Sequence, residues 1–499
     1  MSGLRTNLVL TVASVSAAAL MGCSGTSPDP QGNELGTVAQ DLGTPVVGTG
    51  VLDSDDDQSE TDISVSNLGG ENMITTAYND GSQGICLPWP CTLPITYDQT
   101  NRYVRQGASL MGWSYSVDQG ATWTHGKLTP PPGWSVLWGD PAIGRGNNSQ
   151  NYVFMSNLAV PVANFPTGQG YISGSLEPYL GGACIAKSTD GGKTFAIAQC
   201  VSNNNHFYDG GSIAVDNLGR VFFATNDVTA GTIDVWMANS PTSQFNLIAN
   251  PFPGYAMESH PRIRAWGNNI YIVAQRSGDD VLLINKYGSS WATPAVASQA
   301  PHNPTTEGGY VSFLNGKTVR FGPQFSFDVA DASAFGNDNI RILFTELYSG
   351  KHSLYATVCN TSLQCWEAPE WSTEWESGDQ FHPSVAAYGG FIGSPERFEA
   401  TYWSRYGDAS GSTVKLKHGA LAVIGSGTPS RVFVTFDLTA SQTVCPDWRG
   451  YWGDYQGTKY AFLNGLTPKF LTTFTDSSAG CDKYWEYDSH NVHVSAVTF

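Results

Sequence analysis

From about residue 45 onward, short hydrophobic runs alternate with clusters of Gly, Asn, Asp and Pro. The runs are rich in Val, Ile, Tyr, Phe, Trp and Thr, which favour β-strands, and no stretch of useful length has the period of an amphipathic helix. The pattern therefore predicts an all-β fold.

A two-strand unit recurs within this pattern. Each copy has a short strand, a turn carrying Gly or Asn, and a second strand of aromatic or aliphatic residues that ends in a polar residue. Self-similarity of this kind is typical of a fold built from repeats. The unit can be placed seven times, with its two strands at 60–65 and 73–80, 140–143 and 152–157, 209–215 and 221–227, 260–263 and 270–275, 322–325 and 340–346, 382–385 and 398–405, and 453–455 and 470–476.

Two segments share the motif Ser-X-Asp-X-Gly-X-Thr-aromatic, at Ser116–Trp123 and Ser188–Phe195. We expect a tight hairpin in which the Asp carboxylate accepts turn amides, the Gly adopts a positive φ and the aromatic ring packs between sheets. Gly288–Trp291 looks like a weaker copy. The motif resembles the Asp box, or BNR repeat, of sialidase-like β-propellers. That resemblance implies a β-propeller over residues 45–499, seven-bladed by the number of repeats, with a six-bladed sialidase-like ring as the alternative.

The two ends of the chain are expected to meet in such a fold. The last predicted strand, His490–Phe499, would be the third of its sheet, which leaves one edge open. The extended segment Pro45–Val51 is placed to supply the missing strand. We therefore expect an N-terminal strand to close the propeller.

Residues 1–22 look like an export signal. They carry one charged side chain and the apolar run Leu8–Leu20, which is too short to span a bilayer. The sequence Leu-Met-Gly-Cys that ends at Cys23 resembles the lipobox of bacterial lipoproteins, which implies lipidation of this cysteine. Residues 23–44 then read as a flexible tether and residues 45–499 as a single domain. The expected location is the bacterial cell envelope, outside the cytoplasm, with the lipid as the only membrane contact.

Eight cysteines remain once Cys23 is set aside, and an even number in an exported chain indicates disulfides. No spacing matches the CxxC pairs of a zinc ribbon. Pairing each cysteine with its neighbour in sequence is a hypothesis, because other connectivities exist. It joins Cys86 to Cys91, Cys184 to Cys200, Cys359 to Cys365 and Cys445 to Cys481.

The chain has 43 acidic and 25 basic residues, a formal net charge of -18. Such an excess of negative charge repels phosphate backbones and anionic lipid surfaces, which excludes nucleic acid as a partner. The resemblance to sialidases instead implies extracellular glycan as the partner, and we expect a monomer.

In a propeller, the residue just before each innermost strand points into the central funnel. Reading that position in each repeat gives a ring of charged and imidazole side chains: Glu60, Asp140, Asp209, His260, Arg320, His382 and Asp454. Such groups supply acid/base pairs, oxygen ligands for a cation or a polar floor for a sugar. The alternative is a purely structural ring, because the same residue types line water-filled channels.

Known sialidases bind the substrate carboxylate with three arginines and use a Tyr and Glu nucleophile couple with an Asp acid/base. The first repeat here has no arginine, so the chain departs from that pattern. Arg262 and Arg320 are the predicted carboxylate-binding residues. Seven-bladed polysaccharide lyases are a second resemblance, in which His260, His382, Tyr208, Tyr451 and Arg262 would fill the His, Tyr and Arg roles.

The segment 447–455 concentrates aromatic rings, one cation and acids directly before the last innermost strand. Exposed aromatic rings stack on sugar faces. Trp448, Tyr451 and Trp452 are therefore predicted to bind substrate.

Asp53, Asp55 and Asp57 alternate in an acidic run, which makes Ca²⁺ the one cofactor to consider. The run lacks the Gly and the closing Glu of an EF-hand loop. A solvated turn is the favoured interpretation, and no metal ligand is assigned.

These observations predict an envelope lipoprotein that binds or cleaves extracellular glycan at the funnel. The predicted catalytic residues are Asp140, Asp209, Glu60, His260, His382 and Asp454. As a glycoside hydrolase or polysaccharide lyase, the protein would use the carboxyl groups as acid and base, assisted by the histidines. The alternatives are a propeller that holds glycan or protein without turnover, and a purely structural envelope protein.

Overall fold

The computed structural model describes residues 45–46, 50–51, 58–68, 71–80, 103–146, 151–166, 171–173, 179–202, 206–258, 260–298, 310–312, 318–320, 325–329, 340–348, 351–367, 378–388, 397–404, 413–424, 430–437, 442–443, 456–461, 469–476 and 491–498. The named elements in these ranges are antiparallel strands and one 3₁₀-helix, η3 (Val162–Asn164). The all-β prediction is confirmed. Across the same ranges, no helix is long and apolar enough to cross a lipid bilayer.

The first four sheets follow one another along the chain, and strand order within each largely follows the sequence. The first contains β3 (Gln58–Leu68), β4 (Glu71–Asp80), β6 (Met111–Ser116) and β7 (Thr124–Lys127). The second contains β8 (Trp134–Leu137), β9 (Ala142–Arg145), β10 (Val153–Pro161), β12 (Gly182–Ser188) and β13 (Ala196–Ser202). The third contains β14 (Tyr208–Val215), β15 (Val221–Asp227), β16 (Thr232–Ala238) and β17 (Asn246–Ile248). The fourth contains β18 (Arg262–Trp266), β19 (Asn269–Gln275), β20 (Leu282–Tyr287) and β21 (Ala295–Val296).

Three more sheets and two small two-stranded sheets complete the described structure. The fifth sheet contains β24 (Phe325–Val329), β25 (Ile340–Tyr348), β26 (Lys351–Cys359) and β27 (Cys365–Glu367). The sixth contains β28 (Gln380–Tyr388), β29 (Arg397–Ser404), β30 (Thr413–Ile424), β31 (Ser430–Asp437) and β32 (Gln442–Thr443). The seventh contains β33 (Thr458–Ala461), β34 (Lys469–Asp476), β35 (Asn491–Thr498), β1 (Pro45–Val46) and β2 (Gly50–Val51). Two-stranded pairs join β5 (Tyr103–Arg105) to β11 (Tyr171–Ser173), and β22 (Tyr310–Ser312) to β23 (Thr318–Arg320).

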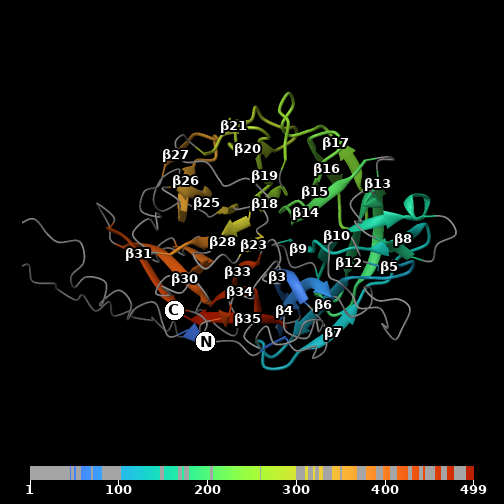
Figure 1. Ribbon diagram of the computed structural model, residues 1–499, viewed down its shortest axis with the longest axis horizontal. Helices are drawn as coiled ribbons and strands as arrows, with labels where there is room; N and C mark the ends of the chain where they lie inside the picture. The colour runs from blue at the N-terminus through green and yellow to red at the C-terminus, as the bar shows by residue number, and fades with distance from the viewer. Residues whose placement is uncertain are drawn as a thin grey trace, which may run out of the picture.

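The sheets lie around a common centre (Figure 1). The innermost strands are β3, β9, β14, β18, β24, β28 and β33. Each contacts the next, and β33 contacts β3 again. The N-terminal strands pair with the C-terminal one, with Val46 opposite Ala496 and Val51 opposite Val492. Residues distant in sequence are therefore brought to one hub.

The hydrophobic core lies between neighbouring sheets. Ile63 of the first sheet shares a cluster with Leu471 of the seventh, and Phe154 of the second shares one with Phe223 of the third. Similar clusters join the first sheet to the second, the third to the fourth, the fourth to the fifth and the fifth to the sixth. Burial of apolar side chains between neighbouring sheets therefore fixes the positions of their innermost strands relative to one another.

The first predicted Asp-box hairpin has the expected structure. The Asp118 carboxylate accepts hydrogen bonds from Ser116 Oγ at 2.7 Å and from the backbone N–H and hydroxyl of Thr122 at 2.8 and 2.6 Å. Gly120 has a φ of 94°, which glycine adopts at little cost. Trp123 packs against the cluster between the first and seventh sheets. The turn thus joins two strands and also helps to hold two sheets together.

The second Asp-box hairpin repeats this arrangement. Asp190 accepts from Ser188 Oγ at 2.7 Å and from Thr194 Oγ1 at 2.6 Å, and Gly192 has a φ of 113°. Phe195 packs between the first and second sheets, edge-on to Trp113 at a ring separation of 5.4 Å. Both motifs therefore serve sheet packing.

Two of the four predicted disulfides form in the described residues. Cys184 and Cys200 join β12 to β13, and Cys359 and Cys365 join β26 to β27. Disulfides suit an oxidising compartment. The remaining cysteines, namely Cys23, Cys86, Cys91, Cys445 and Cys481, lie outside the described residues.

Candidate functional site

Three predicted site residues meet where β9, β14 and β18 begin. One ligating atom each from Asp140, Asp209 and His260 lies within 4.8 Å of the other two. We call these three residues the mouth cluster. His260 Nε2 lies 3.2 Å from Asp209 Oδ1. Asp140 and His260 are buried, whereas 37% of the Asp209 side chain is exposed, so the cluster meets solvent mainly through Asp209.

The local backbone places each member of the mouth cluster. Asp140 has a φ of 56°, and its N–H donates to Asn79 Oδ1 at 3.0 Å. The Asp140 carboxylate in turn accepts the N–H of Gly210 at 3.3 Å. The first contact joins the second sheet to the first, and the other joins it to the third.

Gly210 makes room for the imidazole of His260. Its φ is 62°, and a Cβ atom there would lie 2.1 Å from His260 Cδ2. It stands in a bulge of β14, where the register shifts between Asp209 and Ser212. The bulge turns the start of the strand so that Asp209 reaches His260. A residue with a side chain at 210 would displace the ring.

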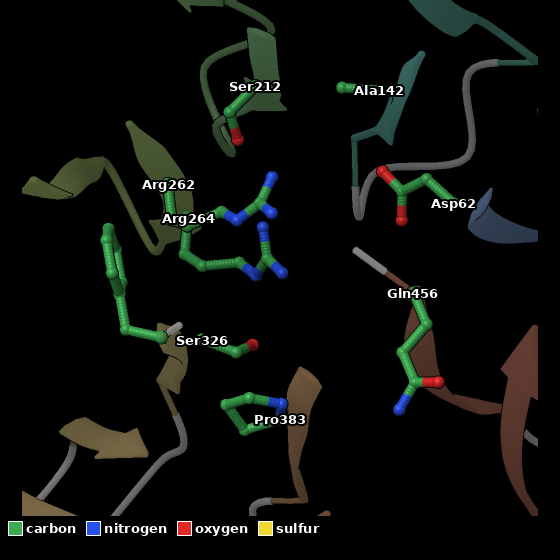
Figure 2. Close-up of a pocket in the computed structure, with 9 residues that line it drawn as sticks. Asp62, Ala142, Ser212, Arg262, Arg264, Ser326, Pro383 and Gln456 are labelled. Carbon is green, nitrogen blue, oxygen red and sulfur yellow. The ribbon is translucent and has the colours of Figure 1, made fainter. Parts of the chain in front are cut away.

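A small cavity is lined by residues that follow the mouth cluster along the innermost strands (Figure 2). Six of the seven innermost strands contribute to the lining, and the seventh, β33, is represented by Gln456, two residues before its first residue. The polar lining residues are Asp62, Ser212, Arg262, Arg264, Ser326 and Gln456. We call this space the central cavity. Its position shows that the seven strands share one hub.

The charges of the central cavity are arranged asymmetrically. Arg262 and Arg264 extend into it from β18, opposite Asp62 (Figure 2). The Asp62 carboxylate accepts the backbone N–H groups of Ile63 at 2.8 Å and Ile143 at 2.9 Å. Arg264 Nε lies 3.7 Å from Asp328 Oδ1, an ion pair without a hydrogen bond. The cationic side is therefore built by a single strand.

His382 is buried in the innermost strand of the sixth sheet, where it is repelled in its protonated form by the positive charge of Arg262. Burial, and then this neighbouring positive charge, lower the pKa of His382 to about 3. Its backbone carbonyl accepts a hydrogen bond from Gln456 Nε2 at 3.0 Å. The imidazole is therefore neutral near pH 7.

Other predicted residues are placed away from the mouth cluster or lack a described side chain. Tyr208 is fully buried among hydrophobic side chains and donates to Asp234 at 2.9 Å, so it does not line the cavity. Glu60 lies in a bulge of β3 and Arg320 ends β23 opposite Tyr310; only their backbones are described. Asp454, Trp448, Tyr451, Trp452, Asp53, Asp55 and Asp57 lie outside the described residues.

Asp62 and Gln456 are cavity residues that the sequence did not indicate. Both occupy the same level as Ser212 and Arg262 on neighbouring strands. The available signal was the repeat itself, because Gln456-Gly457-Thr458 aligns with Gly210-Gly211-Ser212 at the start of an innermost strand. The strand of the seventh repeat begins at Thr458, later than the predicted 453–455.

No protein-family model matches the chain, and no curated protein matches it. Similar solved structures are sialidases and related β-propeller glycosidases at low sequence identity. A Hadza microbial sialidase is 12% identical with a TM-score of 0.40 over 77% of this chain and 66% of its own. Trypanosoma rangeli sialidase in complex with sialic acid is 12% identical with a TM-score of 0.38 over 73% and 54%. An α-L-arabinanase of Penicillium chrysogenum complexed with arabinobiose is 12% identical with a TM-score of 0.34 over 74% and 96%. The chain thus spans less than two thirds of either sialidase.

Proposed function

We propose that the protein acts on extracellular glycan at the mouth cluster, as a glycoside hydrolase. The observation that carries this proposal is the convergence of Asp140, Asp209 and His260 from three separate sheets. Paired carboxyl groups are the usual machinery of glycoside hydrolysis, and retaining enzymes hold them about 5 Å apart. An oxygen of Asp140 and an oxygen of Asp209 lie within 4.8 Å of each other, so that one substrate could contact both carboxylates.

The proposed roles follow from exposure and contact. Asp209 is the carboxylate that a substrate meets first, and His260 orients it through the 3.2 Å contact. Asp140 is the second member of the acid/base pair, and its hydrogen bonds with Gly210 and Asn79 fix its position. Arg262, the first residue of β18 and two residues after His260, supplies positive charge for an acidic sugar.

Substitution of Asp209 tests the proposal. After a panel of acidic and neutral glycans has identified a substrate, we expect Asp209→Asn and Asp140→Asn each to lower kcat/KM roughly 10² to 10⁴-fold with the unfolding temperature retained. Exposed Asp279, paired with Arg276, provides the control Asp279→Asn with unchanged kcat/KM. In a retaining mechanism, azide rescue of an Asp→Ala variant gives a glycosyl azide of inverted configuration when the nucleophile is missing and of retained configuration when the acid/base residue is missing, which separates the two roles. Full activity in both Asp→Asn variants would contradict the proposal.

Binding without turnover is the second candidate function. The central cavity is too small to surround a sugar ring. A glycan would then rest on the mouth and the loops around it. Saturable glycan binding with no released product, unaffected by Asp140→Asn, would favour this function.

We also propose that residues 45–499 form one seven-bladed propeller closed by its N-terminal strand. The circular contacts of the innermost strands and the pairing of β1 and β2 with β35 support this arrangement. Deletion of residues 45–51 should lower the unfolding temperature by exposing the edge of β35. Unchanged stability would favour the six-bladed alternative.

Export and lipidation at Cys23 complete the proposal. The two disulfides support a location outside the cytoplasm. Radiolabelled palmitate should be incorporated by the full chain and not by Cys23→Ser. Equal labelling of both would refute lipidation at this cysteine.

A further inference from the structure

The donors and acceptors of the central cavity are separated. Ser212, Arg262, Arg264 and Ser326 line one side, and Asp62 and Gln456 line the other (Figure 2). Ser212 Oγ accepts the N–H of Ile263 at 3.0 Å, and Ser326 Oγ accepts that of Val385 at 3.2 Å. Each hydroxyl therefore keeps its own proton for donation, with two guanidinium groups between them.

One donor on that side has no hydrogen-bond acceptor in the described protein. The Nε of Arg264 is buried without such a partner, since Asp328 at 3.7 Å is too distant for a hydrogen bond. A buried charged donor left in this state is costly. Burial, and then the charge of Arg264, lower the pKa of nearby Lys459, while the carboxylates of Asp328 and Asp62 raise it.

The cavity has room for one small species. Its volume is about 20 Å³. A single water-sized occupant needs roughly 10–15 Å³. A chloride ion is only slightly larger than water, whereas a sugar carboxylate with its ring is far larger.

We propose that the central cavity binds a single small inorganic anion, of the size of chloride, between Arg262 and Arg264. The hydroxyl groups of Ser212 and Ser326 complete the donor set. Charge-assisted hydrogen bonds from guanidinium groups favour such an ion, and the ion offsets the repulsion between the two arginines. The anion site is separate from the mouth cluster, and this proposal does not depend on the protein acting on glycan.

Thermal unfolding in different sodium salts tests the site. The folded mature protein is compared in sodium chloride, sodium gluconate and sodium acetate at equal ionic strength. We expect chloride to raise the unfolding temperature in a saturable manner, because the ion binds the folded state. Gluconate is too large to enter, and should have no saturable effect. Stabilisation by acetate but not by chloride would mean a carboxylate site and would overturn the proposal.

Three variants test whether the effect of chloride on the unfolding temperature arises in the central cavity. Arg264→Gln removes one cation, and Ser326→Ala removes one hydroxyl with little change in size; both should abolish or weaken the chloride-dependent shift at least several-fold. Arg276→Gln, an exposed arginine paired with Asp279, should keep it. A shift that persists equally in all three variants would place the ion elsewhere. Bromide soaked into crystals should give an anomalous peak between Arg262 and Arg264, and a cavity without that peak would exclude the site.

Discussion

The Asp-box hairpins and the mouth cluster use aspartate in opposite ways. In the hairpin, Asp118 accepts three hydrogen bonds from residues within four positions of itself. In the mouth cluster, Asp140, Asp209 and His260 come from three sheets and meet only because the sheets share a hub. The hairpin aspartates are satisfied by their own turn and support structure. The mouth aspartates face each other and a histidine, an arrangement that stability alone does not require.

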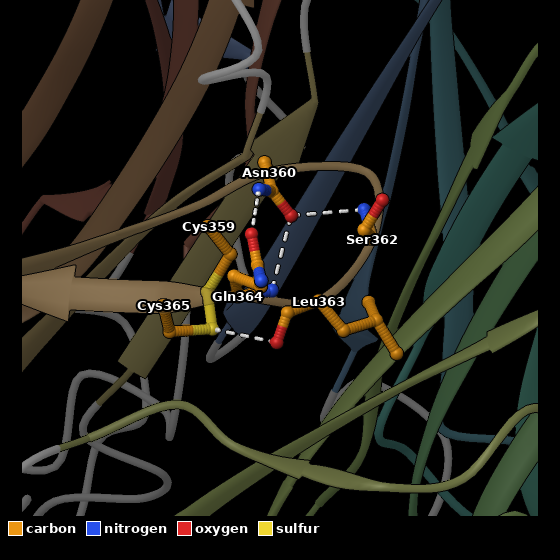
Figure 3. Close-up of a disulfide and its surroundings, with 6 residues drawn as sticks. All are labelled: Cys359, Asn360, Ser362, Leu363, Gln364 and Cys365. Atoms are coloured by element: carbon orange, nitrogen blue, oxygen red, sulfur yellow. Dashed lines mark hydrogen bonds between the residues drawn. A yellow bond between two sulfur atoms is a disulfide. The ribbon is translucent and has the colours of Figure 1, made fainter.

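A hairpin of this kind also forms without the Ser-X-Asp-X-Gly-X-Thr-aromatic motif. In the fifth sheet the turn between Cys359 and Cys365 has no Asp box, yet Asn360 Oδ1 accepts the N–H groups of Ser362 and Gln364 at 2.9 and 3.0 Å (Figure 3). Leu363 packs between the fourth and fifth sheets, where the aromatic residue packs in the other hairpins. The mouth has no such substitute, because its geometry depends on single residues such as Gly210.

Gly210→Ala should have the largest effect on stability. Its Cβ would meet the His260 ring at 2.1 Å in a backbone conformation that alanine disfavours, so we expect a loss of about 3 kcal/mol in unfolding free energy. Gly231→Ala is the matched control, since Gly231 has a φ of 64° and nothing within 4 Å of its would-be Cβ. It should lose only about 1 kcal/mol. Denaturant unfolding compares the two, and equal losses would mean that the close approach to His260 is unimportant.

Acid titration probes the hub through His382. Its pKa of about 3 in the folded protein lies below its ordinary value of 6.5, so the unfolded chain binds more protons between these pH values. Stability should therefore fall as the pH decreases from 6.5 toward 3, by at most about 1.4 kcal/mol per pH unit from this group. His382→Asn suits the positive φ of 51° and removes the titration. The variant should show a shallower pH dependence of its unfolding free energy; parallel curves would contradict a buried neutral imidazole.

The sequence predicted local structure well and the hub only in part. Both Asp boxes and the pairings Cys184–Cys200 and Cys359–Cys365 depend on neighbouring residues, which a sequence displays directly. Asp140 and His260 could be placed because they precede innermost strands. Side chains alternate along a strand, so that Asp209 faces the mouth while Tyr208 packs against residues of the second sheet.

β-bulges explain why some residues that line the central cavity are not predicted from the sequence. The register shifts at the start of β3, β14 and β28, in each case beside a predicted site residue. A bulge adds one residue to one strand, which changes the direction of every side chain before it. Hydrophobic periodicity does not reveal such a shift. The sequence pattern therefore does not predict that Asp62, within β3, lines the central cavity.

Removing the Asp118 carboxylate should have the smallest effect, because the hairpin is exposed and partly redundant. We expect Asp118→Ala to cost about 1 kcal/mol at pH 7. Hydrogen bonds from Thr122 and Ser116 lower the pKa of Asp118 to about 2, below its ordinary value of 3.8. A lowered folded pKa gives stability that is present above pH 4 and is lost as the pH falls toward 2. The difference in unfolding free energy between wild type and variant should therefore shrink between pH 4 and pH 2. A difference that stayed constant over this range would show that the turn is held by packing of Trp123 and not by the charged carboxylate, which would remove the contrast with the mouth cluster.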